Sequence, residues 1–182
     1  MQTVLLVEGN SDRIALETLA GRRGQDLSEV RIVDLRGVTN ASRAMTEFGQ
    51  DGSTSHLAGL CDIGEERYFR GGLERAGLGP VSDVQAMERL GFFVCDADLE
   101  DELIRALGSA STIDILEEQG DQRAFRVFQN QPFQRARTVE QQLHRFIGTT
   151  AGRKAQYARA LVDGLDLARV PRPLLAVLDY VA

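Results

Sequence analysis

Three segments of this chain end in acidic residues, and this repeated pattern restricts the possible folds more than any other feature. Glu8, Asp62 and Asp96 each follow a run of five or six mainly apolar residues. Such runs, separated by helical patterns, are typical of buried parallel strands, whose carboxyl ends meet at one edge of a sheet. The sequence therefore predicts a group of carboxylates at that edge. Because such crowding is costly without a cation, it favours a divalent metal site.

The periodicity of the rest predicts an α/β fold, with a parallel sheet of about four strands, right-handed connections and helices on both faces. The expected strands cover residues 3–7, 30–35, 56–61 and 91–95. The expected helices cover residues 11–23, 39–48, 65–76, 99–107, 113–119, 139–147, 151–165 and 171–181. We expect residues 1–108 to form the α/β core and residues 109–182 to form a helical C-terminal extension packed on it.

Composition argues against a membrane protein and a disulfide-stabilised one. The chain has 182 residues, 43% of them hydrophobic, which is enough for one compact domain. No stretch approaches the roughly 20 apolar residues of a membrane span and no signal peptide pattern is present, so we expect a cytoplasmic protein without a membrane partner. Cys61 and Cys95 end predicted strands and are expected to be buried, reduced thiols. His56 and His144 have no Cys or His at zinc-binding spacing nearby, which argues against a zinc site.

Charge is divided unevenly along the chain, whose net charge is −6. Residues 1–122 carry 11 arginines against 23 acidic residues, a net charge of −12, whereas residues 123–159 have a net charge of +7. An acidic metal-binding part followed by a basic part suits a polyanionic substrate. An arginine-rich solvated surface would have the same composition, and charge alone does not distinguish the two. The polar segment 129–138 is expected to be a mobile loop that faces substrate.

The motifs of several other α/β enzymes are missing from the sequence. There is no glycine-rich loop ending in Lys-Ser or Lys-Thr, which argues against ATP hydrolysis by a P-loop. Glu8 follows the first strand at the place where a dinucleotide-binding fold needs backbone donors for a pyrophosphate. No serine lies in a nucleophile-elbow pattern. Hydride transfer and serine hydrolysis are therefore not expected.

Five short segments combine apolar strands, acidic residues and a basic motif: Val4–Asp12, Leu60–Asp62, Phe93–Cys95, Asp98–Leu103 and Gly152–Lys154. Together they resemble the TOPRIM domain, and closely that of the OLD (overcoming lysogenization defect) family of nucleases, over most of residues 1–165. The resemblance implies phosphodiester chemistry on nucleic acid, with DNA favoured, and one or two Mg²⁺ or Mn²⁺ ions. Family members usually carry an ATPase module ahead of this domain. Because Met1 stands directly before the first predicted strand, we expect the ATPase to be absent or supplied by another chain.

The resemblance also implies roles for individual side chains. Glu8 is the expected metal ligand or general acid/base, and Lys154 is the expected catalytic cation beside the phosphate. Gly64 stands where the family pattern has a second aspartate, a change for which Glu65 or Glu66 could compensate. The expected metal ligands are Glu8, Asp12, Asp62, Glu66, Asp98 and Glu100. The expected nucleic-acid contacts are Arg123, Arg126, Arg135, Arg137 and Arg153.

Several of the acidic residues have a structural alternative. Asp101 and Glu102 are expected mainly to stabilise the positive end of the helix that follows the fourth strand, and Asp12, Asp98 and Glu100 could act in the same way. The predicted function is that of a metal-dependent endonuclease or phosphodiesterase. One alternative is a non-catalytic TOPRIM module that binds metal or nucleic acid and regulates a partner ATPase. The other is a nucleotidyl transferase or primase-like enzyme.

Overall fold

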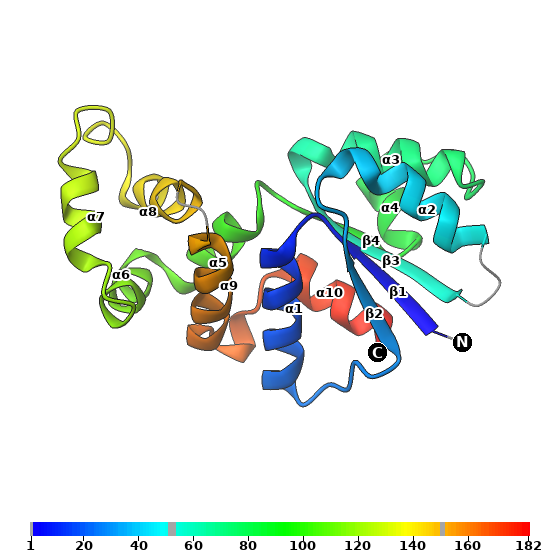
Figure 1. The fold of residues 1–182 in the computed structure, drawn as a ribbon, viewed down its shortest axis with the longest axis horizontal. Coiled ribbons are helices and arrows are strands. Elements are labelled where there is room, and N and C mark those ends of the chain that lie inside the picture. Colours follow the sequence, from blue (N-terminus) through cyan, green and yellow to red (C-terminus); the bar gives the residue numbers. More distant parts are fainter. Residues whose placement is uncertain (1, 51–53, 150–151) are drawn as a thin grey trace.

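A four-stranded parallel sheet forms the centre of the molecule (Figure 1). The computed structural model describes residues 2–50, 54–149 and 152–182. The strands are β1 (Gln2–Val7), β2 (Val30–Asp34), β3 (Thr54–Asp62) and β4 (Phe92–Cys95). Their order is β2-β1-β3-β4, and every neighbouring pair is parallel. The predicted α/β fold is thus confirmed.

Helices connect the strands and continue to the end of the chain. The first group is α1 (Asn10–Arg23), α2 (Ala41–Gln50), α3 (Glu66–Arg75), α4 (Val84–Arg89) and α5 (Leu99–Leu107). The second group is α6 (Ser109–Glu118), α7 (Gln122–Gln129), α8 (Val139–Gly148), α9 (Arg153–Gly164) and α10 (Arg172–Val181). Short 3₁₀ turns η1 (Val38–Asn40), η2 (Ile63–Glu65) and η3 (Leu167–Arg169) complete the connections.

Strand β1 separates two hydrophobic cores. Leu5 and Val7 belong to the core that includes side chains of α1, α5 and α8 to α10, whereas Val4 and Leu6 belong to the core under α2, α3 and α4. Figure 1 shows α1 and α10 on one face of the sheet and α2, α3 and α4 on the other. Because successive side chains of a strand point to opposite faces, one continuous apolar run can supply both layers. This arrangement fixes the carboxyl tips of β1 and β3 between the layers.

The C-terminal helices return to the sheet. Helix α10 contacts β3 and β4, and helix α9 packs against α1. Arg22 of α1 donates hydrogen bonds to the carbonyl oxygens of Val162 and Leu165, over 2.5 and 2.8 Å. Helices α6 to α8, which we call the helical lobe, extend away from the sheet (Figure 1). Their packing includes an edge-to-face contact of Phe125 with Phe146, whose ring centroids are 5.2 Å apart. The expected division of the chain at residue 108 stays a prediction.

Two helices, α4 and α7, were not expected from the sequence. Helix α4 has only six residues and starts at a cap in which the amide of Ala86 donates to Asp83 over 2.8 Å. Helix α7 has eight residues and buries only Phe125. Elements this short contain too few periodic positions to stand out in a sequence pattern. The helix expected over 151–165 begins at Arg153, and Ala151 lies outside the described residues.

Cys61 and Cys95 are buried free thiols, as predicted. Burial raises the pKa of both thiols, so both stay protonated and unreactive near neutral pH. Within the described parts of the chain, none of the helices has the length and apolar character needed to cross a membrane.

Candidate functional site

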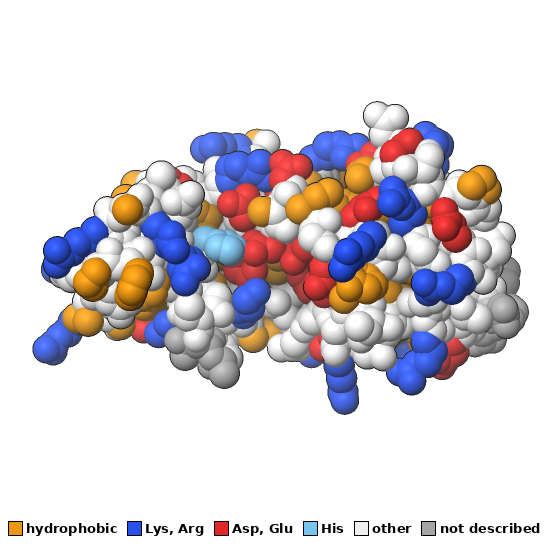
Figure 2. All heavy atoms as spheres, turned by 90° about the horizontal axis from the view of Figure 1, so that it is seen from above, with side chains coloured by type: hydrophobic (Ala, Val, Ile, Leu, Met, Phe, Trp, Pro, Cys, Tyr) orange, Lys and Arg blue, Asp and Glu red, His pale blue; other side chains and the backbone are white. Residues whose placement is uncertain are grey.

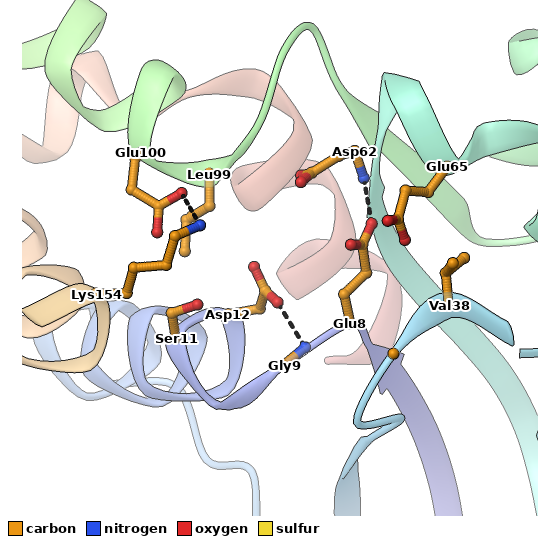
Figure 3. Close-up of a pocket in the computed structure, with 11 residues that line it drawn as sticks. Glu8, Gly9, Ser11, Asp12, Val38, Asp62, Glu65, Leu99, Glu100 and Lys154 are labelled. Atoms are coloured by element: carbon orange, nitrogen blue, oxygen red, sulfur yellow. Dashed lines mark hydrogen bonds and ion pairs between the residues drawn. The ribbon is translucent and has the colours of Figure 1, made fainter. Parts of the chain in front are cut away.

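A polar cavity of about 260 Å³ lies at the carboxyl ends of β1 and β3 (Figure 3). We call it the acidic pocket. Its lining residues are Glu8, Gly9, Ser11, Asp12, Gly37, Val38, Asp62, Glu65, Leu99, Glu100 and Lys154. They come from the tips of two strands, the first turns of α1, α5 and α9, and two connecting segments. The structure therefore brings together five residues that were singled out in the sequence: Glu8, Asp12, Asp62, Glu100 and Lys154.

Glu8 and Asp62 lie at the tips of adjacent strands and are joined by a hydrogen bond. The backbone amide of Asp62 donates to Glu8 Oε1 over 2.7 Å. Burial raises the pKa of Glu8 to about 8; the Asp62 amide opposes this shift, and the charges of Asp62 and Glu65 add to it. Burial also raises the pKa of Asp62 to about 8, with further contributions from Asp12 and Asp98. Both carboxyl groups would therefore gain from a cation that shares their charge.

Asp12 combines a structural role with a place in the acidic pocket. Its Oδ2 accepts a hydrogen bond from the amide of Gly9 over 2.9 Å, which fixes the first turn of α1. The same side chain lines the pocket. Burial raises its pKa to about 6, the Gly9 amide opposes this, and the charge of Glu100 adds to it. Helix capping and cation binding are therefore compatible at this position.

Lys154 and Glu100 form an ion pair on the wall of the pocket that faces Glu8 (Figure 3). Lys154 Nζ lies 3.2 Å from Glu100 Oε2, although the residues are 54 positions apart in the sequence. Burial alone would lower the pKa of Lys154, but the charges of Glu100, Asp98 and Asp62 outweigh it and raise this pKa. Lys154 is thus held as a cation, which suits charge stabilisation and does not suit a general base.

Asp98 and His144 form a hydrogen bond that the sequence did not predict. Asp98 Oδ1 caps α5 by accepting from the amide of Asp101, and its Oδ2 lies 2.6 Å from His144 Nε2. Potential ligand atoms of Asp98, Glu100 and His144 all lie within 4.8 Å of one another. His144 comes from α8, 46 residues from Asp98, so no local motif could have indicated the pairing. Burial would raise the pKa of Asp98, but the hydrogen bond with His144 lowers it, and the pKa of His144 rises through the same bond.

The segment after β3 contains Glu65 and Glu66, the two residues that could compensate for the aspartate missing at position 64. Glu65 lines the acidic pocket, whereas Glu66 is not in its lining and pairs with Arg70 over 3.2 Å. A Cβ atom added at Gly64 would meet nothing within 4 Å. The position therefore has room for the aspartate of the family pattern.

The acidic residues around the start of α5 have two different roles: some stabilise the local structure, and Glu100 lines the pocket. Asp96 and Glu102 both pair with Arg105, at 2.8 and 2.7 Å, and neither lines the acidic pocket. Glu102 also accepts a hydrogen bond from the Asp96 amide over 2.9 Å. These contacts stabilise the turn between β4 and α5 and thereby fix the position of Glu100, which follows on the first turn of the helix.

The arginines proposed for nucleic-acid contact lie mainly outside the acidic pocket. Arg123, Arg126 and Arg135 are exposed on the helical lobe, and Arg137 lines a second cavity of about 280 Å³ together with His144. Arg153 has a packing role, since its guanidinium lies 4.1 Å from the centre of the Phe146 ring and pairs with an aspartate of the lobe. Figure 2 shows acidic side chains gathered at the centre of one face, with basic side chains on both sides.

The donor set of the acidic pocket fits a hard divalent cation. Burial, with added repulsion from neighbouring carboxylates, raises the pKa of Glu8, Asp12 and Asp62 well above the usual values. The side chain of Glu100 is only 5% exposed, and its Oε1 has no hydrogen-bond partner in the described structure. Oxygen ligands of this kind are those that Mg²⁺ and Mn²⁺ prefer.

Comparison with known proteins identifies similar folds and one matching family model. Residues 1–53 match the model of the family described as "Overcoming lysogenization defect protein-like, TOPRIM domain". A search of curated proteins found no match. The C-terminal region of the Burkholderia pseudomallei OLD protein has a TM-score of 0.68 at 21% identity, over 99% of this chain and 96% of that chain.

A second similar structure is the platinum-phased C-terminal region of the Xanthomonas campestris pv. campestris OLD protein. Its TM-score is 0.77 at 19% identity, over 99% of this chain and 91% of that chain. The TM-scores and coverages show a shared fold, and this likeness extends well beyond the segment matched by the family model. The chain therefore has the fold of OLD-protein C-terminal regions, and its predicted resemblance to the OLD-like TOPRIM domain is confirmed.

Proposed function

We propose that this protein is a metal-dependent nuclease that hydrolyses phosphodiester bonds of nucleic acid, with DNA as the favoured substrate. The observation that supports it most is the convergence of Glu8, Asp12, Asp62, Glu100 and Lys154 in one pocket at the carboxyl edge of the sheet. In open α/β sheets this edge is the usual position of the active site. Carboxylates that would hold a divalent ion, beside the ammonium group of Lys154, suit a phosphate more than a neutral substrate.

Two groups of side chains would hold one or two Mg²⁺ or Mn²⁺ ions in and beside the pocket. Glu8, Asp12 and Asp62, which line the pocket, form the first group. The second group is Glu100, also in the lining, with Asp98, which lies outside the lining but close to Glu100. Ions of this kind, when bound, activate a water molecule and stabilise the leaving oxygen of a phosphodiester.

Glu8 and Lys154 would act directly on the reacting groups. The hydrogen bond from the Asp62 amide to Glu8 Oε1 orients this carboxylate in the pocket, where it would bind a cation or take a proton from water. Lys154 Nζ, held by Glu100, would stabilise the negative charge that develops on the phosphate. The raised pKa of Lys154 keeps this group charged throughout the neutral range.

The exposed arginines of the helical lobe would bind the nucleic-acid backbone next to the pocket. Arg123, Arg126 and Arg135 lie on a part of the chain with few acidic residues. We expect their joint replacement by alanine to weaken DNA binding and to reduce the slope of log affinity against log salt by about one for each phosphate that is no longer bound. Fluorescence anisotropy over a salt series measures both quantities. Arg43→Ala, on the exposed surface of α2, is the control and should change neither.

The direct test is cleavage of plasmid and short single-stranded DNA and RNA in Mg²⁺ or Mn²⁺. We expect wild-type protein to cleave, and Glu8→Gln and Lys154→Met to lose at least about 100-fold in rate. Glu118→Gln, on the exposed surface of α6, should behave as wild type. No cleavage by wild-type protein, or full activity of Glu8→Gln, would overturn the proposal.

Gly64 supports one rival, a non-catalytic module that binds metal or nucleic acid and regulates a separately encoded ATPase. The glycine removes one carboxylate from the family pattern, which leaves fewer ligands for two ions. Calorimetric metal titration distinguishes the two cases, since one weak site together with absent turnover would favour the binding module. Incorporation of labelled nucleotide in place of strand scission would instead favour a nucleotidyl transferase.

A further inference from the structure

We propose that Asp98, Glu100 and His144 form a mixed nitrogen–oxygen site that takes a transition divalent ion, of which Mn²⁺ and Co²⁺ are the probes, in preference to Mg²⁺. The inference rests on the proposed function. It assigns a class of metal ion to the second group of ligands, Asp98 and Glu100. It adds His144 as a ligand, a role that neither the sequence pattern nor the family resemblance gives to this residue.

The tertiary fold places His144 in the site. Asp98 and Glu100 belong to the start of α5, whereas His144 belongs to α8, and these two helices pack against each other. One potential ligand atom from each residue lies within 4.8 Å of the others, which is compatible with three ligands around a single ion. Helix capping accounts for Asp98 Oδ1 alone. It does not account for the approach of an imidazole to Oδ2.

The unpaired oxygen of Glu100 is an independent sign of a missing ligand. The side chain is 5% exposed, Lys154 pairs with Oε2, and Oε1 is buried without a hydrogen-bond partner among the described residues. A buried carboxylate oxygen that lacks a partner costs free energy, and such atoms are rare in native structures. A cation beside Asp98 and His144 would satisfy it.

The hydrogen bond between Asp98 and His144 indicates how the ion would enter. His144 Nε2 and Asp98 Oδ2 are 2.6 Å apart, so a single proton lies between them. A cation that replaces this proton would be bound by the Nε2 lone pair and by the carboxylate together. The proton leaves to solvent, and no redox change is involved.

The imidazole nitrogen of His144 would make the site bind transition ions more tightly than Mg²⁺. Mg²⁺ selects oxygen ligands and keeps much of its water shell, so an imidazole adds little to its affinity. First-row transition ions accept imidazole readily, and their affinity for mixed nitrogen and oxygen sites rises from Mn²⁺ through Co²⁺. The Asp98–Glu100–His144 site therefore differs from the oxygen ligands of Glu8, Asp12 and Asp62.

Electron spin echo measurements on the Mn²⁺-loaded protein test direct ligation. The chain has two histidines, and His56 is exposed on β3, so His56→Gln is a matched control. We expect a coupling from a directly bound nitrogen in wild type and in His56→Gln at saturating Mn²⁺, and its loss in His144→Gln. Labelling histidine with ¹⁵N identifies the residue type. Absence of nitrogen coupling in Mn²⁺-loaded wild type would overturn the inference even if the His144 variant failed to fold.

Calorimetry supplies the second readout. We expect His144→Gln to weaken Mn²⁺ and Co²⁺ binding at the second site by about 10-fold or more, with little change for Mg²⁺. Glutamine keeps a donor for Asp98, so an equal loss for all three ions would show that His144 only positions the carboxylate, and would contradict ligation. Both readouts are independent of cleavage. Nitrogen coupling without strand scission would thus uphold this inference while the nuclease proposal failed.

Discussion

At Glu8, burial and charge repulsion act in the same direction. Burial, the charge of Asp62 and the contact with Glu65 all raise its pKa, and only the Asp62 amide opposes them. In the absence of a cation, the folded protein therefore favours the protonated form near neutral pH. A bound cation would reverse this preference. The ionised form of Glu8 would then be unfavourable in the metal-free protein and favourable in the metal-bound protein.

Replacement of Glu8 by glutamine should separate stability from activity. We expect Glu8→Gln to raise the thermal midpoint in EDTA by about 2–4 °C above pH 8, where the wild-type carboxylate is ionised, and to have little effect near pH 5. Cleavage, assayed separately with Mg²⁺ or Mn²⁺, should be lost at both pH values. Calorimetric unfolding at the two pH values measures the effect, with Glu118→Gln as the control. Destabilisation of Glu8→Gln above pH 8 would contradict the expectation.

Lys154 is the only lysine in the chain, and its partner Glu100 is buried. We expect Lys154→Met to lower the thermal midpoint, because the Glu100 carboxylate loses its counter-charge. The double variant Lys154→Met/Glu100→Gln should recover most of that loss, since no buried charge remains. Arg159→Met, exposed on the same helix, should leave the midpoint unchanged. Failure of the double variant to recover would argue against coupling between the two residues.

Among the secondary-structure elements, the sequence predicted features set by neighbouring residues and missed contacts that depend on tertiary packing. The strand tips at Glu8 and Asp62 could be recognised because an apolar run and the acid that ends it are adjacent in the sequence. Their convergence follows from parallel pairing, which the alternation of strands and helices also predicted. The approach of His144 could not be predicted, because it depends on how α8 packs against α5. Helix α7 was missed because it has only eight residues, so its core-facing side chains, Phe125 and the partly buried Phe128, cover little more than two turns.

The turn η2 offers a test of the altered family pattern. We expect Gly64→Asp to fold normally, because an added Cβ meets nothing within 4 Å and the backbone there is not left-handed. The new carboxylate should tighten Mg²⁺ binding, by roughly 10-fold if it reaches the ion. Gly64→Asn, of nearly the same size but neutral, is the control for steric effects. Equal metal affinity in both variants would show that position 64 lies too far from the site.

At the scale of the whole molecule, the acidic pocket is closed by parts of the chain that are distant in sequence. The turn after β1 supplies Glu8, helix α5 supplies Glu100 and helix α9 supplies Lys154. Helix α9 is held on α1 by the bonds from Arg22, so the pocket forms only when the C-terminal part has folded. The stability of the whole chain and the protonation of the pocket are therefore linked.

This linkage predicts how stability depends on pH. The pKa values of Glu8 and Asp62 rise to about 8 and that of Asp12 to about 6, so the folded state binds more protons than the unfolded state above about pH 4.5. The contribution of these three groups to stability in EDTA should be fully present below their unfolded pKa and should be lost as the pH rises through about 8. The raised pKa of His144 changes stability in the same direction, because the stability that this group contributes is also lost as the pH rises.

Saturating Mg²⁺ or Mn²⁺ should flatten this profile, because the ion competes with protons for the same carboxylates. The increase in thermal midpoint caused by metal should therefore grow from pH 5 to pH 8. Thermal unfolding over this range, in EDTA and with metal, measures both curves. The double variant Glu8→Gln/Asp62→Asn should have a flatter profile in EDTA and a smaller response to metal. A wild-type profile in EDTA that rises between pH 5 and pH 8 would show that other groups dominate the linkage.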